Sequence, residues 1–227
     1  MKTSLPARPN LDHLRKQAKA LLSELRAGKA DAARTFIQHL PAAKTWTPKQ
    51  VRDAGLRLAD AQSAIARKSG FGNWSGLARH VEQLRAWEGE WRFLSLEVDG
   101  GAMPAPMSAQ SRLLVDGDRF RMESPEATYE GIFTIDVDAE PASIDIEFVE
   151  GPEAGQWSYG IYQIDGDDLV LCIGLVGAAR PARFATTRGS GHALERLRRS
   201  SPARPERVTG GRREGAFVTV EVGCGPC

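Results

Sequence analysis

The most reactive residue types in this sequence are the two cysteines of Cys224-Gly225-Pro226-Cys227. Cysteines three positions apart can direct both sulfur atoms at one metal ion or form a small disulfide ring. Thiolates are soft ligands, so copper or zinc is the metal that this pair would hold. Metal binding, disulfide exchange and an exposed end without a role all remain open for Cys224 and Cys227.

The C-G-P-C spacing is similar to the redox motif of thioredoxins, in which the N-terminus of a following helix activates the first thiol. We expect no activating helix here, because the sequence ends at Cys227 and the residues before Cys224 show no βαβ pattern. A thioredoxin fold is therefore not expected.

A second group of candidates consists of aromatic and basic side chains of the kind that line ligand cavities. The candidate ligand-binding residues are Arg121, Trp157, Tyr159, Tyr162, Arg183 and His192. Core packing for the aromatic residues and surface exposure for the arginines is the alternative, because the sequence does not show which face of each strand points inward. The stretch from Arg188 to His192 lacks the lysine of a phosphate-binding loop, so we predict a turn there.

Catalytic patterns are missing from the sequence. No serine lies in a nucleophile-elbow motif, and the acidic residues between Asp136 and Glu153 form no pair whose spacing requires acid–base chemistry. His13, His39 and His80 do not have metal-ligand spacing. These observations favour a non-catalytic function.

The elements that position these residues begin with an all-α module over residues 1–87. Apolar residues from Leu11 to Leu25 recur at three- and four-residue steps, with Asn10 as the N-cap and Gly28 as the stop signal. Further helices are expected from Asp31 to Leu40, from the capping box at Thr47, from Leu58 to Lys68, and after Asn73.

Residues 88–199 change to a period of two, with turn signals such as Asp116-Gly117 and Asp165-Gly166 between the alternating segments. About eight or nine strands without crossover helices predict an antiparallel barrel, since closure removes exposed edges. The fold class is thus α+β. Residues 200–227 read as a flexible Arg/Gly/Pro-rich tail in which Phe217 to Val222 is compatible with one strand.

Four stretches carry a family resemblance: G-E-W-R-F-L-S-L-E-V-D-G (89–100), Y-E-G-I-F-T-I-D (129–136), G-I-Y-Q-I-D-G-D-D-L-V-L-C-I (160–173) and R-P-A-R-F-A-T-T-R-G-S-G-H (180–192). Through them, the segment from Trp87 to Arg199 resembles a bacterial lipocalin-like domain family common in planctomycetes. The resemblance implies a calycin-type barrel and no particular chemistry. In such barrels, a tryptophan of the first strand closes one end beneath an arginine of the last strand. The resemblance thus implies Trp91 beneath Arg198, with Arg196 as second choice.

The stretch I-A-R-K-S-G-F-G-N-W-S-G-L (65–77) resembles a portable helical module seen ahead of ankyrin-repeat and glyoxalase-like domains. That resemblance implies docking or solubility rather than catalysis.

Charge is distributed unevenly along the chain, with +10 over residues 1–87, −15 over residues 88–179 and +6 over the remainder. We expect the helical module to lie against the acidic barrel. Nucleic-acid binding through Arg67, Lys68, Arg79 and Arg85 is disfavoured, because the neighbouring barrel would repel phosphates. The sequence shows neither a secretory signal nor a membrane-spanning run, so a cytoplasmic protein is expected.

The leading functional hypothesis is non-catalytic binding of a small, partly apolar molecule in the barrel, with the helical module docking a protein partner. The alternative is a metal-binding or thiol-redox accessory protein that acts through Cys224 and Cys227. Nucleic-acid binding by the basic helices is the third hypothesis, and no membrane association is expected.

A truncation tests the alternative. Ending the chain after Gly223 should remove any bound metal and any fast thiol reactivity while leaving the melting temperature unchanged, because a flexible linker is expected before it. Metal analysis and thiol titration of both proteins measure this. Equal metal content and equal reactivity would eliminate the alternative.

Overall fold

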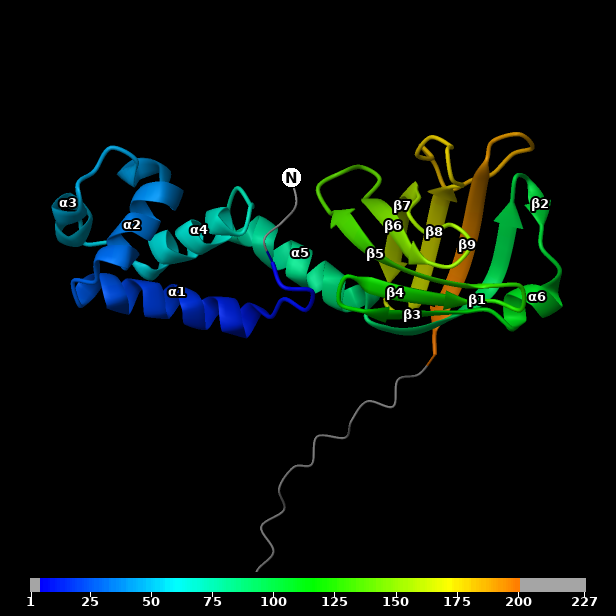
Figure 1. The fold of residues 1–227 in the computed structure, drawn as a ribbon, viewed down its shortest axis with the longest axis horizontal. Coiled ribbons are helices and arrows are strands. Elements are labelled where there is room, and N and C mark those ends of the chain that lie inside the picture. The colour runs from blue at the N-terminus through cyan, green and yellow to red at the C-terminus, as the bar shows by residue number, and fades with distance from the viewer. Residues whose placement is uncertain (1–4, 201–227) are drawn as a thin grey trace, which may run out of the picture.

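The computed structural model describes residues 5–200, and it confirms an α+β fold in which helices precede a closed antiparallel barrel (Figure 1). The helical part comprises α1 (Leu11–Arg26), α2 (Ala30–His39), the 3-10 turn η1 (Pro41–Ala43), α3 (Pro48–Asp53), α4 (Leu58–Lys68) and α5 (Trp74–Trp87). The barrel part comprises β1 (Gly89–Val98), β2 (Gly101–Ala102), α6 (Ala105–Ala109), β3 (Arg112–Asp116), β4 (Arg119–Glu123), β5 (Thr128–Asp136), β6 (Ser143–Glu150), β7 (Trp157–Asp165), β8 (Asp168–Gly174) and β9 (His192–Arg199). The possible strand at 217–222 and the Cys224/Cys227 pair lie outside the described residues.

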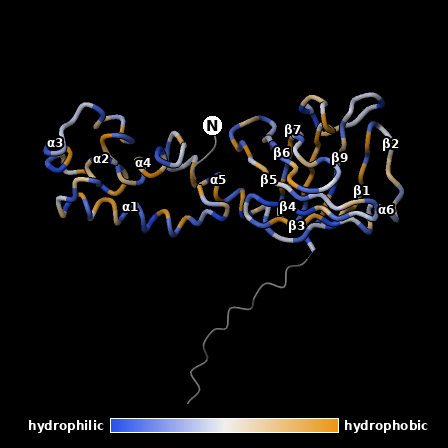
Figure 2. The backbone as a smooth tube through the Cα atoms, viewed as in Figure 1, coloured by the Kyte–Doolittle hydropathy of each residue, from blue (hydrophilic) through white to orange (hydrophobic). Residues whose placement is uncertain are grey.

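The helices begin where their capping residues predict. The Asn10 side chain accepts hydrogen bonds from the backbone N–H groups of Asp12 and His13, and Thr47 forms a capping box with Gln50. Hydrophobic and hydrophilic residues alternate along α1 (Figure 2), and its apolar stripe faces α4 and α2. The stripe thereby builds the core of the helical module.

The barrel closes because β1 pairs with both β3 and β9, so strands β1 and β3–β9 form a continuous ring. All of these pairings are antiparallel, and consecutive strands from β3 to β9 are neighbours. Because the ring is closed, each of these eight strands is hydrogen-bonded to a neighbouring strand on both sides. The short strand β2 pairs with the far end of β1 and extends the sheet there.

Two separate apolar cores meet within α5. Leu77 and Val81 belong to the core of the helical module, whereas Leu84 and Trp87, further along the same helix, belong to the core of the barrel. The helix therefore contributes to both cores, and its last turn packs into the barrel.

The floor of the barrel is built from two buried tryptophans. Trp87 is 2% exposed and packs against Phe133 and Tyr162, and Trp91 is fully buried. The indole N–H of Trp91 donates to the Trp87 carbonyl oxygen at 2.8 Å. The floor thus fixes the start of β1 to the end of α5.

The arginine over Trp91 is Arg199, which corrects the expected Arg198. The Arg199 guanidinium carbon lies 4.0 Å from the centre of the Trp91 ring, a cation–π distance. Trp91 is directly opposite Arg199 in the β1–β9 register, so both side chains share a face of the sheet. Arg198 points the other way and pairs with Asp168 at 2.9 Å, and Arg196 is exposed on the same outer face.

The helical module contacts the barrel at two ion pairs, Arg8 with Asp116 and Arg79 with Asp138. All four side chains are mostly exposed, so solvent screens both pairs and they stabilise the junction only weakly. Burial of Trp87 and Leu84 therefore dominates the junction, while α1 to α4 extend away from the barrel (Figure 1). The charge-driven contact that the sequence predicts is limited to these two pairs among the described residues.

A backbone contact adds to this junction at the β3–β4 turn. The Asp118 N–H donates to the Ala7 carbonyl oxygen at 3.2 Å. Gly117 has a φ of +64°, and a Cβ there would lie 2.3 Å from the same oxygen. Only glycine permits this approach.

Among residues 5–200, no helix combines the length and the apolar character needed to cross a lipid bilayer.

Replacement of Trp91 by alanine should lower the free energy of unfolding by about 3–5 kcal/mol, as for other buried aromatic side chains. Urea denaturation followed by circular dichroism measures the change. The matched control is Trp157→Ala, because Trp157 is 40% exposed on the outer face. An unchanged midpoint for the Trp91 variant would contradict the floor described above.

Candidate functional site

Among residues 5–200, one carboxylic acid side chain is buried, and it faces the inside of the barrel. Glu195 of β9 is only 7% exposed and belongs to the inward-facing set of that strand with Leu197. It lies opposite Leu96 on β1 and Leu171 on β8. No hydrogen bond or ion pair to Glu195 occurs among residues 5–200. An acidic side chain therefore stands unpaired between apolar neighbours.

Glu195 lines an interior cavity of about 60 Å³. The other lining residues are all apolar or aromatic: Trp87, Leu113, Val115, Phe120, Met122, Phe133, Ile144, Ile146, Phe148, Leu171 and Ile173. This space holds a few water-sized groups, or a short hydrocarbon segment. Trp87 forms part of its lining, so the floor of the barrel also bounds the cavity.

A second cavity of about 230 Å³ forms the mouth of the barrel. Met122, Phe148, Ile173 and Glu195 line both cavities, which places them next to each other. The mouth is lined by Phe93, Leu96, Val98, Met103, Ser111, Met122, Ser124, Pro125, Glu126, Tyr129, Phe148, Glu153, Ile173, Leu175, Ala193 and Glu195. None of these described lining residues is a lysine, an arginine or a histidine, while three are glutamates.

Burial controls the protonation of these groups. It raises the pKa of the Glu195 carboxyl from 4.5 to about 7, because the ionised form loses its hydration. Burial also raises the pKa of Glu153 and, with help from the charges of Glu153 and Glu126, the pKa of Tyr129. Glu195 therefore changes its charge close to neutral pH.

Most of the candidate ligand residues face away from this interior. Arg121 is exposed and pairs with Glu123 and Glu130 on the outer face. Trp157 and Tyr159 are each 40% exposed, and the Arg180 guanidinium lies 5.5 Å from the centre of the Tyr159 ring. Their outward placement corrects the expected lining, since alternation alone does not tell which face is inside.

The remaining candidates also lie outside the two cavities. Arg183 is exposed in the β8–β9 loop, and His192 belongs to the outward-facing set of β9. Tyr162 alone points inward, where it packs edge-on against Trp87, and burial raises its pKa to about 12. It is a structural part of the floor and lines neither cavity.

The glycine-rich stretch before β9 is the predicted turn. Both carboxylate oxygens of Asp99 are engaged there, accepting 2.9 Å hydrogen bonds from the Gly189 and Gly191 N–H groups. These bonds lower the pKa of Asp99. Because Asp99 already occupies these N–H groups, they anchor the loop to the β1–β2 turn.

Cys172, the cysteine within the described residues, is fully buried, and burial raises the pKa of its thiol. Between residues 5 and 200, no group of three or more His, Cys, Asp or Glu side chains is arranged to hold a metal ion. The copper or zinc site predicted at Cys224 and Cys227 lies outside this range and stays a prediction.

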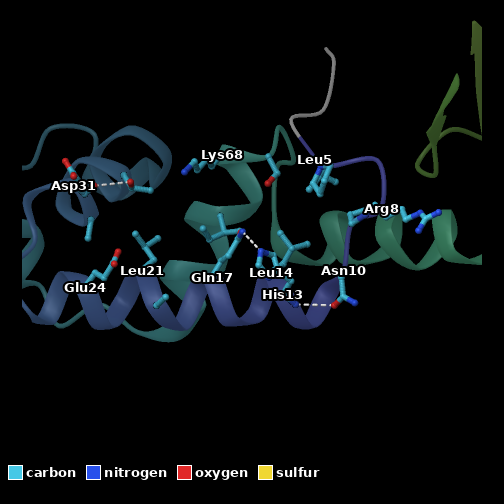
Figure 3. A pocket seen from close by; sticks show the side chains of 17 residues that line it. Leu5, Arg8, Asn10, His13, Leu14, Gln17, Leu21, Glu24, Asp31 and Lys68 are labelled. Atoms are coloured by element: carbon cyan, nitrogen blue, oxygen red, sulfur yellow. Dashed lines mark hydrogen bonds between the residues drawn. The ribbon is translucent and has the colours of Figure 1, made fainter. Parts of the chain in front are cut away.

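A larger hollow of about 560 Å³ lies on the helical module between the N-terminal segment, α1, α2 and α4 (Figure 3). Several of its polar groups are already engaged by neighbouring residues. Asn10 caps α1, the Gln17 amide nitrogen lies 2.9 Å from His13 Nε2, and the Thr35 hydroxyl donates to the Asp31 carbonyl oxygen. The hollow is open, and we assign no chemistry to it.

No protein-family model matches the chain, and no curated protein sequence is significantly similar to it. Among solved structures, the chain is similar to a mutant of the fluorescent protein UnaG, with 14% sequence identity and a TM-score of 0.28. The match covers 52% of this chain and 99% of that protein. The likeness is too remote to assign a ligand, and the resemblance to the planctomycete family stays a prediction.

Glu195 was not among the site residues predicted from the sequence, although its position in the last strand carries a signal. Ala193, Glu195 and Leu197 occupy alternate positions of the last strand, so the apolar pair indicates that the carboxylate between them faces inward. A charged residue within an inward-facing set is the mark of a polar anchor in an apolar cavity.

The pH dependence of stability tests the burial of Glu195. Because folding raises its pKa, the folded state binds more protons between pH 4.5 and 7, and stability falls as pH rises through this window. The difference between the two pKa values corresponds to about 3 kcal/mol, so Glu195→Gln should gain up to that amount over the wild type between pH 4.5 and pH 8.

Urea denaturation at several pH values measures this gain. Glu150→Gln, at the exposed end of β6, is the control and should follow the wild type. A pH profile of Glu195→Gln parallel to the wild-type profile would contradict the buried, unpaired carboxyl.

Proposed function

We propose that the barrel binds a small, largely apolar molecule without chemical turnover. The observation that carries the proposal is an apolar interior cavity, bounded at one end by Trp87 and adjoining at the other a mouth of about 230 Å³. Displacing water from such surfaces is favourable by roughly 25 cal/mol per Å² of apolar area. Small-molecule sites in proteins have this composition, with few polar groups among many apolar ones.

The residues inside favour binding over catalysis. Glu195 is the one titratable side chain among the described residues that line the interior cavity. Acid–base chemistry on a substrate commonly uses two groups with different protonation states. A lone carboxyl group in an apolar cavity can instead fix the orientation of a bound molecule.

The other parts of the functional hypothesis stay predictions. The docking role of the helical module rests on its resemblance to portable modules, and the thiol chemistry of Cys224 and Cys227 concerns residues outside 5–200. For nucleic acid, Arg79 is already paired with Asp138 of the barrel, which removes one of the four basic groups from that surface.

Titration with 1-hexanol, followed by NMR chemical shifts of the backbone amides, tests the proposal. We expect saturable shifts confined to the residues around the two cavities. Ala193→Phe places a ring in the mouth and should weaken binding by about tenfold or more, because the ring occupies the volume that the hexyl chain would fill.

The matched control is Arg196→Phe, which adds the same ring to the exposed outer face of the same strand and should leave the affinity within about twofold. Absence of saturable binding in the wild type would overturn the proposal. Equal affinities in wild type and Ala193→Phe would place the binding elsewhere.

A further inference from the structure

The unpaired carboxyl group restricts the chemistry of the bound molecule. Glu195 is 7% exposed, has no hydrogen-bond or ion-pair partner among residues 5–200, and lines both the interior cavity and the mouth. A buried ionised carboxylate without a partner is costly, and a ligand that supplies an opposite charge relieves that cost. The site is thus complementary to a positive group at the junction of the two cavities.

The other charged side chains that line the mouth are also negative. Glu126 and Glu153 lie on the rim of the mouth, and no basic side chain occurs among the described residues that line either cavity. A ligand with its own carboxylate would meet three acidic groups and no cation. An ammonium group would meet acceptors at the rim and at Glu195, and charge-assisted hydrogen bonds of this kind are stronger than neutral ones.

We infer that the barrel takes an amine with an apolar body, whose ammonium group binds the Glu195 carboxylate while the hydrocarbon part fills the adjacent apolar space. This inference rests on the proposed function and narrows it to a ligand class. The interior cavity of about 60 Å³ admits only a short hydrocarbon segment, so a compact amine fits better than a long-chain lipid.

Three probes with the same hydrocarbon body test the inference: hexylammonium, 1-hexanol and hexanoate. At pH 8 most of Glu195 is ionised, since its pKa is about 7. The dissociation constant of hexylammonium, measured by NMR titration of the full chain, should be at least about tenfold lower than those of the other two.

Glu195→Gln should keep the shape of the side chain and lose its charge. We expect hexylammonium to bind this variant about as weakly as 1-hexanol, while the affinity for 1-hexanol stays within about twofold of the wild type. Glu150→Gln is the control and should keep the preference for the amine. Circular dichroism of both variants establishes that they are folded.

The outcomes separate this inference from the proposed function. If none of the three probes binds, both are overturned. If all three bind without preference, or hexanoate binds as tightly as hexylammonium, the barrel binds apolar molecules and only the amine class is overturned. Retention of the amine preference in Glu195→Gln would likewise overturn the role of Glu195.

Discussion

The last turn of α5 packs Leu84 and Trp87 into the barrel core, and the carbonyl groups at this helix end have no partner within the helix. Arg199 supplies a partner by donating to the carbonyl oxygens of Ala86 and Glu88 while its guanidinium covers the ring of Trp91. The same residue pairs with Asp167 and forms part of the β1–β9 seam. The Arg199 side chain thereby connects the end of α5, the tryptophan floor and the strand pair that closes the barrel.

This floor gives the interior its character. Trp87 and Trp91 fill one end of the barrel, and Glu195 on β9 lines the mouth at the other. Closure also separates the inner and outer faces. Paired arginines such as Arg121 and Arg198 lie outside, whereas the described cavity linings hold no cation. The carboxylate of Glu195, together with the lack of basic side chains in the described cavity linings, underlies the inferred preference for amines.

Much of the fold could be predicted from the sequence because local signals were strong. Asn10 and Thr47 cap helices as expected, and alternating apolar residues mark the strands. Trp91 was correctly predicted as the closing residue, but the arginine that covers it is Arg199 rather than Arg198. Leu197 faces the barrel interior, and Arg199, two positions further along β9, lies on the same face. Most of the predicted ligand-binding residues were wrong for the same reason, because the inward face of each strand was not known. Which face of a strand is buried depends on closure of the whole ring, a non-local property.

The binding chemistry inferred for the barrel depends on Glu195, a carboxyl group in the apolar interior with no partner among residues 5–200. A pH titration of the Glu195 side-chain carboxyl carbon by NMR in the unliganded full chain, assigned with Glu195→Gln, measures its pKa. We expect a titration midpoint near 7. A midpoint at the ordinary glutamate value near 4.5 would show a hydrated or paired carboxylate and would contradict the buried, unpaired state.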